Sequence, residues 1–348
     1  GDEAPALLAQ LREVQRRLAA LGEYEAEFAD VPARLEDQKA ILQELAFTFA
    51  NAIEYVRAAI SRGLDVDDFA PQLSFFFVAQ MNLFEEIAKF RAARRLWAKI
   101  MKEKFNAKND KSMTLRFHVQ TAGSSLTLQQ PDNNIVRTTI EALAAALGGC
   151  QSLHTNSKDE AIALPTEASA LTALRTQQII AFETGVGSVV DPCGGSYYIE
   201  NLTSRIEAEV EEYLARIEEM GGAIKAVETG FIQKEIQDSA YEDHQEVESK
   251  RKLVVGVNSF IDKEEEEIPV QRISPELESK QVNYLKEIRA GRDQEKVNAI
   301  LARLSKAAQE SDNLVPIICE AVEAYASVGE ITGSLRQAFG KFRPMVTI

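Results

Sequence analysis

The chain has 348 residues, 45% of them hydrophobic, and a formal net charge of −15 at pH 7. This length allows one large domain or two ordinary ones, and the hydrophobic fraction is typical of a globular protein. The strong negative charge argues against general nucleic-acid binding.

Apolar runs and cysteines indicate where the chain resides. No apolar run is long enough to cross a bilayer, and residues 1–20 lack the continuous apolar segment of a signal peptide. The three cysteines, Cys150, Cys193 and Cys319, lie far apart and form no CxxC pair. The sequence therefore predicts a cytoplasmic protein with no membrane association, no structural zinc and no metal site.

The first 42 residues are expected to be a helical segment. Apolar residues at heptad spacing predict a helix there, at positions Leu7, Leu11, Val14, Leu18 and Leu21. Both a helix packed on its own domain and a coiled-coil dimer fit this short seam. A second apolar stripe, from Leu42 to Ile60, predicts a long helix over 34–62 that ends at Gly63.

Between residues 72 and 183, predicted strands alternate with predicted helices. The strands are expected at 73–78, 114–120 and 150–155, and the helices at 83–102, 133–147 and 167–183. This order is typical of a parallel sheet covered by helices. The first of these helices carries several basic residues, for which a solvated face is the favoured interpretation and a phosphate site the alternative: Lys89, Arg91, Arg94, Arg95 and Lys99.

A turn-rich segment at 191–198 ends this pattern, and mainly helical sequence follows. Helices are expected at 206–220, 231–250, 281–289, 293–309 and 314–326, with one short strand at 253–257 and an acidic loop tip at 263–267. The chain thus divides into three expected parts, at 1–42, 43–200 and 201–348.

The second predicted strand carries the main candidate site. Phe117 and Val119 alternate with His118 and Gln120, so the two polar side chains share one face. Ser74 on the first strand and Gln151 at the third add further polar groups. The lumen of an ordinary (β/α) barrel is filled by branched aliphatic side chains, so inward polar groups would instead suit a tunnel for an amide-rich ligand. A structural role for His118 is the alternative.

Glu160 lies just beyond the third predicted strand. Barrel enzymes place their sites at this end of the strands, but a carboxylate that favours a helix N-terminus would stand there too. The sequence contains no P-loop, no GxGxxG after a strand, no HExxH and no GxSxG. Nucleotide-dependent, zinc-protease and hydrolase chemistry of those kinds is therefore not predicted.

Six motifs, in this order and spacing, resemble one family. They are FAPQLSFFF at 69–77, FEEIAKFRAARRLW at 84–97, RFHVQTAG at 116–123, QSLHTN at 151–156, LPT at 164–166 and DPCGGSYY at 191–198. Over about residues 43–343 the chain resembles the large subunit of adenosylcobalamin-dependent acyl-CoA mutases, the methylmalonyl-CoA mutase family. The resemblance implies an α/β fold in which residues 43–200 are the C-terminal part of a (β/α) TIM-type barrel that binds acyl-CoA. N-terminal helices would precede this part, and a helical extension over 201–348 would follow it.

The resemblance also implies roles for individual residues. His118, as a catalytic residue, and Gln120 would contact the thioester or acyl group, and Ser74 and Gln151 would line the path of the CoA. A second group would meet the adenosyl part of the cofactor adenosylcobalamin, namely Asn156 and Glu160. The expected reaction is a radical 1,2-rearrangement, such as methylmalonyl-CoA to succinyl-CoA, in which the cofactor supplies the radical and the protein supplies positioning.

Three departures from the family pattern shape the expected function. The family has five barrel strands before the one near Leu73, and they carry a catalytic histidine, a tyrosine that steers the radical and an arginine that binds the substrate carboxylate. Residues 33–42 predict a helix instead. Gln72 stands where the family usually has a CoA-binding arginine, and no DxHxxG cobalamin motif follows. The chain is thus expected to need partners, such as a separate cobalamin-binding subunit in a homo- or hetero-oligomer. The alternative is a non-catalytic acyl-CoA-binding or assembly module.

Overall fold

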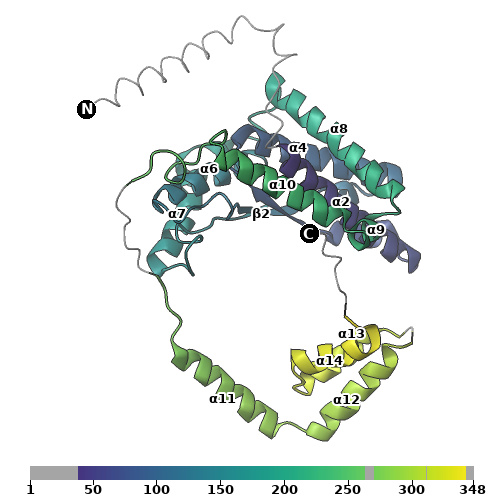
Figure 1. The fold of residues 1–348 in the computed structure, drawn as a ribbon. Helices are drawn as coiled ribbons and strands as arrows, with labels where there is room; N and C mark the ends of the chain where they lie inside the picture. The colour runs from purple at the N-terminus through teal and green to yellow at the C-terminus, as the bar shows by residue number, and fades with distance from the viewer. Residues whose placement is uncertain (1–37, 263–269, 311, 342–348) are drawn as a thin grey trace, which may run out of the picture.

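A three-stranded parallel sheet lies at the centre of the computed structural model, which describes residues 38–262, 270–310 and 312–341. Its strands run in the order β1 (Phe75–Ala79), β2 (Phe117–Thr121) and β3 (Ser152–His154). The crossovers contain α4 (Leu83–Lys99) and α6 (Asn133–Leu147), and α7 (Glu167–Glu183) follows β3. Helices cover one face of the sheet (Figure 1), which confirms the expected partial α/β barrel.

Local signals explain these elements. The apolar stripe of α2 (Gln38–Ser61) is buried, with Leu45, Phe49 and Val56 fully enclosed, as the 3.6-residue period predicts. Thr166 caps α7 by accepting a hydrogen bond from the Ser169 amide. Both α6 and α7 have the bounds that were predicted for them. The heptad seam at 7–21 and the acidic tip at 263–267 lie outside the described residues.

The main core is aromatic and lies between the sheet and the helices. Alternate strand residues Phe77, Phe117 and Val119 point into it, as the period-2 pattern predicted. Phe90 of α4 stacks on Phe117 with ring centres 5.3 Å apart, and Trp97, also of α4, lies 4.7 Å from Phe75. Ring contacts of this kind fix how α4 sits on the sheet.

The solvated face predicted for α4 is correct for Arg95 and Lys99, which are exposed, and wrong for the other three basic residues, which are buried or half-buried. Lys89 is fully buried, and Arg91 binds Asp191 and Glu200. Further along, α4 and α8 (Tyr197–Glu219) are joined by the pairs Arg95–Glu207 at 2.8 Å and Lys99–Glu211 at 2.5 Å, and Arg94 donates to the carbonyl of Gly148. The basic side chains of α4 are thus bound to other parts of the chain, and two of them also remain exposed to solvent.

Helices α8, α9 (Ala223–Glu228) and α10 (Phe231–Glu248) complete the main body, so the boundary expected at residue 200 falls inside α8. The strand predicted at 253–257 is wrong. This segment forms turns with a single bridge between Val255 and Ser259, because Asn258 bonds to the backbone of Val247, Lys252 and Val254. Short helical turns occupy Val66–Phe69, Ala70–Gln72, Ile100–Lys104, Asp110–Met113 and Val186–Ser188.

A separate group of helices follows the main body in the chain. It consists of α11 (Pro275–Gly291), α12 (Gln294–Ala307), α13 (Leu314–Glu323) and α14 (Val328–Phe339). The last three share a small core of their own around Val297 and Leu304, whereas α11 has no buried residue. These helices lie apart from the sheet (Figure 1). Among the described helices, none is long and apolar enough to span a membrane.

Candidate functional site

The face of the sheet opposite the helices carries a row of aromatic and polar side chains. Strand register places Phe76, His118 and Ser152 side by side, with Val78, Gln120 and His154 in the next row. His118 Nδ1 lies 2.7 Å from Ser152 Oγ, and its ring centre lies 5.2 Å from that of Phe76, which is 58% exposed. The open face thus combines an aromatic platform with an imidazole that is held in place by a hydroxyl.

Toward the carboxyl ends of the strands, the next row continues into a hydrogen-bonded corner. Gln120 Nε2 donates to Asn156 Oδ1 at 2.9 Å. Asn156 is almost fully buried, and it donates from its backbone amide to Thr121 Oγ1 at 2.9 Å and from Nδ2 to the Thr121 carbonyl at 2.8 Å. These hydrogen bonds fix the side-chain amide of Asn156 between β2 and the loop that follows β3.

Glu160 lies at the same corner, near Gly123 of the loop that follows β2. A Cβ atom added to Gly123 would lie 3.6 Å from Asn156 Nδ2 and 3.8 Å from Glu160 Cγ, at ordinary contact distance, so Gly123 packs beside both side chains. The Glu160 side chain is exposed, and its backbone amide bonds to the Ser157 carbonyl at 3.2 Å. The exposed carboxylate of Glu160 therefore lies near the hydrogen-bonded amide of Asn156.

Asp159, which the sequence did not single out, shapes the loop that presents Glu160. Its carboxylate accepts hydrogen bonds from Ser157 Oγ at 2.5 Å, Ser169 Oγ at 2.6 Å and the Thr166 amide at 3.1 Å. Burial alone would raise the pKa of this carboxyl, but the three hydrogen bonds outweigh burial and lower it. The charged group ties the loop after β3 to the start of α7.

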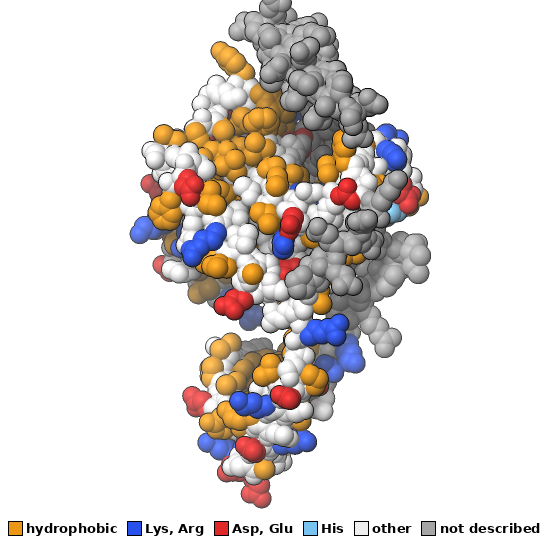
Figure 2. Space-filling model, turned by 90° about the vertical axis from the view of Figure 1, so that its left-hand side faces the viewer, with side chains coloured by type: hydrophobic (Ala, Val, Ile, Leu, Met, Phe, Trp, Pro, Cys, Tyr) orange, Lys and Arg blue, Asp and Glu red, His pale blue; other side chains and the backbone are white. Residues whose placement is uncertain are grey.

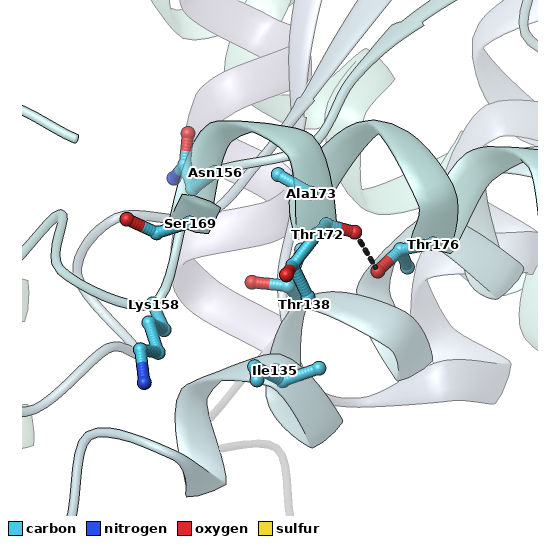
Figure 3. A pocket seen from close by; sticks show the side chains of 8 residues that line it. All are labelled: Ile135, Thr138, Asn156, Lys158, Ser169, Thr172, Ala173 and Thr176. Atoms are coloured by element: carbon cyan, nitrogen blue, oxygen red, sulfur yellow. Dashed lines mark hydrogen bonds between the residues drawn. The ribbon is translucent and has the colours of Figure 1, made fainter. Parts of the chain in front are cut away.

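A small cavity lies behind this corner, between α6 and α7. Hydroxyl-bearing side chains form much of its wall, and Asn156 and Ser169 lie at one end (Figure 3). The lining hydroxyl residues are Thr138, Ser169, Thr172 and Thr176. Asn156 therefore has polar surroundings on the side away from Gln120.

The remaining predicted site residues lie at the opposite, amino-terminal end of the sheet. Ser74 is exposed and directly precedes β1. Gln151 is bound to the backbone, since its Oε1 accepts from the Phe117 amide at 2.7 Å and its Nε2 donates to the Gly149 carbonyl at 3.1 Å. The structure thus brings His118, Gln120, Asn156 and Glu160 into one run and sets Ser74 and Gln151 at its far end.

Two residues on this face were not selected from the sequence. Phe76 lies beside His118. Arg116, two residues before His118 on β2, is exposed and donates to the carbonyls of Pro71 and Leu73. The alternation of strand side chains could have identified both residues, because it puts Phe76 on the face of Ser74 and Arg116 on the face of His118. Arg116 places a cation at the amino-terminal end of the open face.

Beneath the sheet, a buried charge cluster supports the carboxyl end of β1. Lys89 Nζ donates to the Val78 carbonyl at 2.7 Å and pairs with Glu44 at 2.7 Å and Glu86 at 2.5 Å. Glu44 also accepts from the Val78 amide at 2.7 Å. Burial raises the pKa of Glu86 to about 7 although Lys89 opposes the rise, and burial also raises the pKa of Glu141 to about 8.

An apolar surface flanks the site on the α7 side. Hydrophobic side chains gather on the face that includes α7 (Figure 2). Those that are about half exposed or more lie on α7 and in the loop that follows it, at Leu171, Leu174, Ile179, Phe182, Val189 and Val190. Such a patch is typical of a surface that contacts another chain.

Comparison with known proteins identifies the family of the chain. The family model described as methylmalonyl-CoA mutase matches residues 39–341. The chain is 50% identical over 304 residues to the 2-hydroxyisobutanoyl-CoA mutase large subunit of Aquincola tertiaricarbonis, covering 87% of this chain and 54% of that protein. Methylmalonyl-CoA mutase of Escherichia coli (strain K12) is 45% identical over 302 residues, 86% of this chain and 42% of the relative.

The human mitochondrial methylmalonyl-CoA mutase is also 45% identical over 302 residues, covering 86% of this chain and 40% of the relative. The chain spans about half the length of the curated relatives it matches. The match nevertheless includes every strand of the sheet and the corner around Asn156. The chain therefore belongs to the methylmalonyl-CoA mutase family.

Proposed function

We propose that this chain is a component of a cobalamin-dependent acyl-CoA mutase, which catalyses a radical 1,2-rearrangement of an acyl-CoA. The observation that carries the proposal is the single run of ligand-facing groups along the open sheet face. The run begins at Ser74 and Arg116, passes His118 and Gln120, and ends at Glu160. The part of the run along β2, from Arg116 to Gln120, is about 13 Å long, because four residue steps rise about 3.3 Å each. A run of that shape suits an extended ligand such as a CoA thioester.

His118 is the group we assign to the thioester carbonyl. The Ser152 hydroxyl can donate to Nδ1, and a neutral ring then carries its proton on Nε2, where it can donate to a ligand oxygen. Phe76 packs against the same ring and covers one side of it. Imidazole and aromatic ring together would orient the acyl group and keep water away from it.

Glu160 fits the ribose of an adenosyl group, because it offers an exposed acceptor for a hydroxyl. Asn156 is almost fully buried and bonded to Gln120 and Thr121, so we assign it to holding the corner beside Glu160. Adenosylcobalamin, when bound, supplies the radical that abstracts hydrogen from the substrate. The residues of this chain hold the reacting groups in register along the sheet.

A partner chain that binds cobalamin is part of this proposal. One relative is named as a large subunit, and that name implies another subunit in its assembly. The apolar patch on α7 and the loop after it offers a surface for such a chain or for a second copy in a homo- or hetero-oligomer. Cytoplasmic localisation stays a prediction from the sequence.

Titration calorimetry with methylmalonyl-CoA, isobutyryl-CoA and 2-hydroxyisobutanoyl-CoA tests the substrate site. We expect saturable binding to the full chain without cobalamin. His118→Ala should weaken it about tenfold, the effect of one lost hydrogen bond of roughly 1–1.5 kcal/mol. The matched control is His244→Ala, since this exposed histidine pairs with Glu248 on α10 and should leave binding unchanged.

The outcomes separate the two functions. Binding followed by product formation, once a cobalamin-binding partner is added, supports the mutase component. Binding without turnover in any such mixture supports the alternative, a non-catalytic acyl-CoA-binding or assembly module. A folded chain that binds none of the three thioesters overturns the proposed substrate site.

A further inference from the structure

A buried carboxyl group lies under the loop that follows β2. Glu141 of α6 is completely enclosed, and its Oε1 lies 2.5 Å from Ser125 Oγ. The same serine oxygen lies 3.0 Å from the Ala122 carbonyl oxygen. A serine hydroxyl has one proton, so Ser125 cannot donate fully to both oxygens; a neutral Glu141 that donates to Ser125 would let the hydroxyl donate to the Ala122 carbonyl, so that both contacts become hydrogen bonds. That arrangement requires a protonated carboxyl at Glu141.

The charges around Glu141 favour the protonated form. Within the described part of the chain, no lysine or arginine forms an ion pair with it. Lys89 of α4 is bound to Glu44 and Glu86, and Arg137, on the same helix as Glu141, donates to neutral oxygens of Thr127, Asn134 and Val255. Glu86 of α4 adds a nearby negative charge, and the charged residues of the neighbouring α7 are exposed. Burial, reinforced by Glu86, raises the pKa of Glu141 to about 8, although the contacts with Ser125 and Ala122 and the charge of Arg137 oppose the rise.

The loop held by Ser125 is in contact with the proposed site. Its first amide, Ala122, donates to the carbonyl of Ala79 at 2.8 Å. Next to Ser125, the Ser124 hydroxyl accepts from Gln80 at 3.2 Å. Gly123 faces Asn156 and Glu160. Any movement of this loop would therefore change the corner where the run of ligand-facing groups ends.

We propose that Glu141 is a positioning residue, which as a neutral carboxylic acid donates to Ser125 and thereby fixes the 121–125 loop against Asn156 and Glu160. The importance of this corner rests on the proposed function, whereas the anchoring of the loop does not. Above the pH at which Glu141 loses its proton, the donor is lost and an unpaired charge remains in the interior. The loop should then open more often to admit water.

Hydrogen exchange of the full chain, read by mass spectrometry over peptides that contain residues 121–126, tests the anchoring. Protection, corrected for the intrinsic effect of pH, should fall about thirtyfold in the native chain between pH 6.5 and pH 9, because the closed loop binds the proton with a pKa of about 8 and the open loop with the ordinary, lower pKa of a glutamate. Glu141→Gln keeps a donor for Ser125 and should stay protected at both pH values. Ser125→Ala should show, at both pH values, the low protection that the native chain has at pH 9.

The control variant Glu103→Gln changes an exposed glutamate, and its exchange should follow the native chain. Infrared difference spectra of the native chain minus Glu141→Gln should also show the band of a protonated carboxyl at pH 6.5. Protection that is independent of pH in the native chain, or no such band, overturns the proposal. If the thioesters bind no variant, the proposed function fails, and the exchange result still decides the role of Glu141.

Discussion

Replacing Lys89 by methionine should strongly destabilise the main body of the protein. The ammonium is fully buried and bonds to Glu44, Glu86 and the Val78 carbonyl. Methionine fills the space of the stem but leaves the enclosed Glu86 without its cation. Removal of one partner of a buried pair costs about 3–5 kcal/mol, so we expect a loss of that size at pH 8.

The pH dependence of this loss identifies its cause. Burial already raises the pKa of Glu86 to about 7 with Lys89 present, and without the lysine the rise is larger. A carboxyl whose pKa is higher in the folded than in the unfolded state contributes most at low pH, and this contribution is lost as the pH rises through the folded value. At pH 5 the variant can protonate Glu86, so the loss should shrink to about 1–2 kcal/mol, from the orphaned carbonyl and altered packing.

Urea unfolding followed by the fluorescence of Trp97 measures this loss, because that residue is the single tryptophan of the chain and lies in the main core. The matched control is Lys99→Met on the same helix. Lys99 is 43% exposed and pairs with Glu211, so its replacement should cost less than about 1 kcal/mol. A loss below about 1 kcal/mol for Lys89→Met at pH 8, or an equal loss at both pH values, would refute the reasoning.

Three further changes test other parts of the structure. Phe76→Ala should change the free energy of unfolding by less than about 0.5 kcal/mol, since the ring is exposed, but should weaken thioester binding in calorimetry. Asn156→Ala removes the bonds to Gln120 and Thr121 and should cost about 2–4 kcal/mol in urea unfolding; a smaller loss contradicts the corner described here. The hydrogen bond from Arg292 lowers the pKa of Glu330 to about 2, so the melting temperature of the C-terminal helices should fall as pH drops from 4.5 toward 2, whereas Glu330→Gln should be less stable at pH 7 and show a smaller fall.

Local periodicity accounts for what could be predicted from the sequence. Alternation over 115–120 placed His118 and Gln120 on one face, because successive strand side chains point to opposite sides wherever the strand lies. The bounds of α6 and α7 followed from apolar spacing and from Gly148 and Thr166. Features of this kind depend on residues within one or two turns of each other.

Features that depend on distant partners could not be predicted in this way. The basic residues of α4 have the pattern of a solvated face, but Lys89 meets Glu44 from a helix 45 positions earlier, and Arg91 meets Glu200 far along the chain. The apolar run at 253–257 resembled a strand, yet it lies beside no other strand of the described sheet. Asp159 was missed because its hydrogen-bonded neighbours meet only when the loop folds.

The two hydrophobic clusters of the described chain share no member, since one surrounds the sheet and the other lies among α12, α13 and α14. Cooperativity of unfolding arises from shared packing, so the chain should melt as two units with separate heat-absorption peaks. Substitutions in one unit should then combine additively with those in the other. Changes in the packing of the C-terminal helices can thus accumulate without altering the sheet.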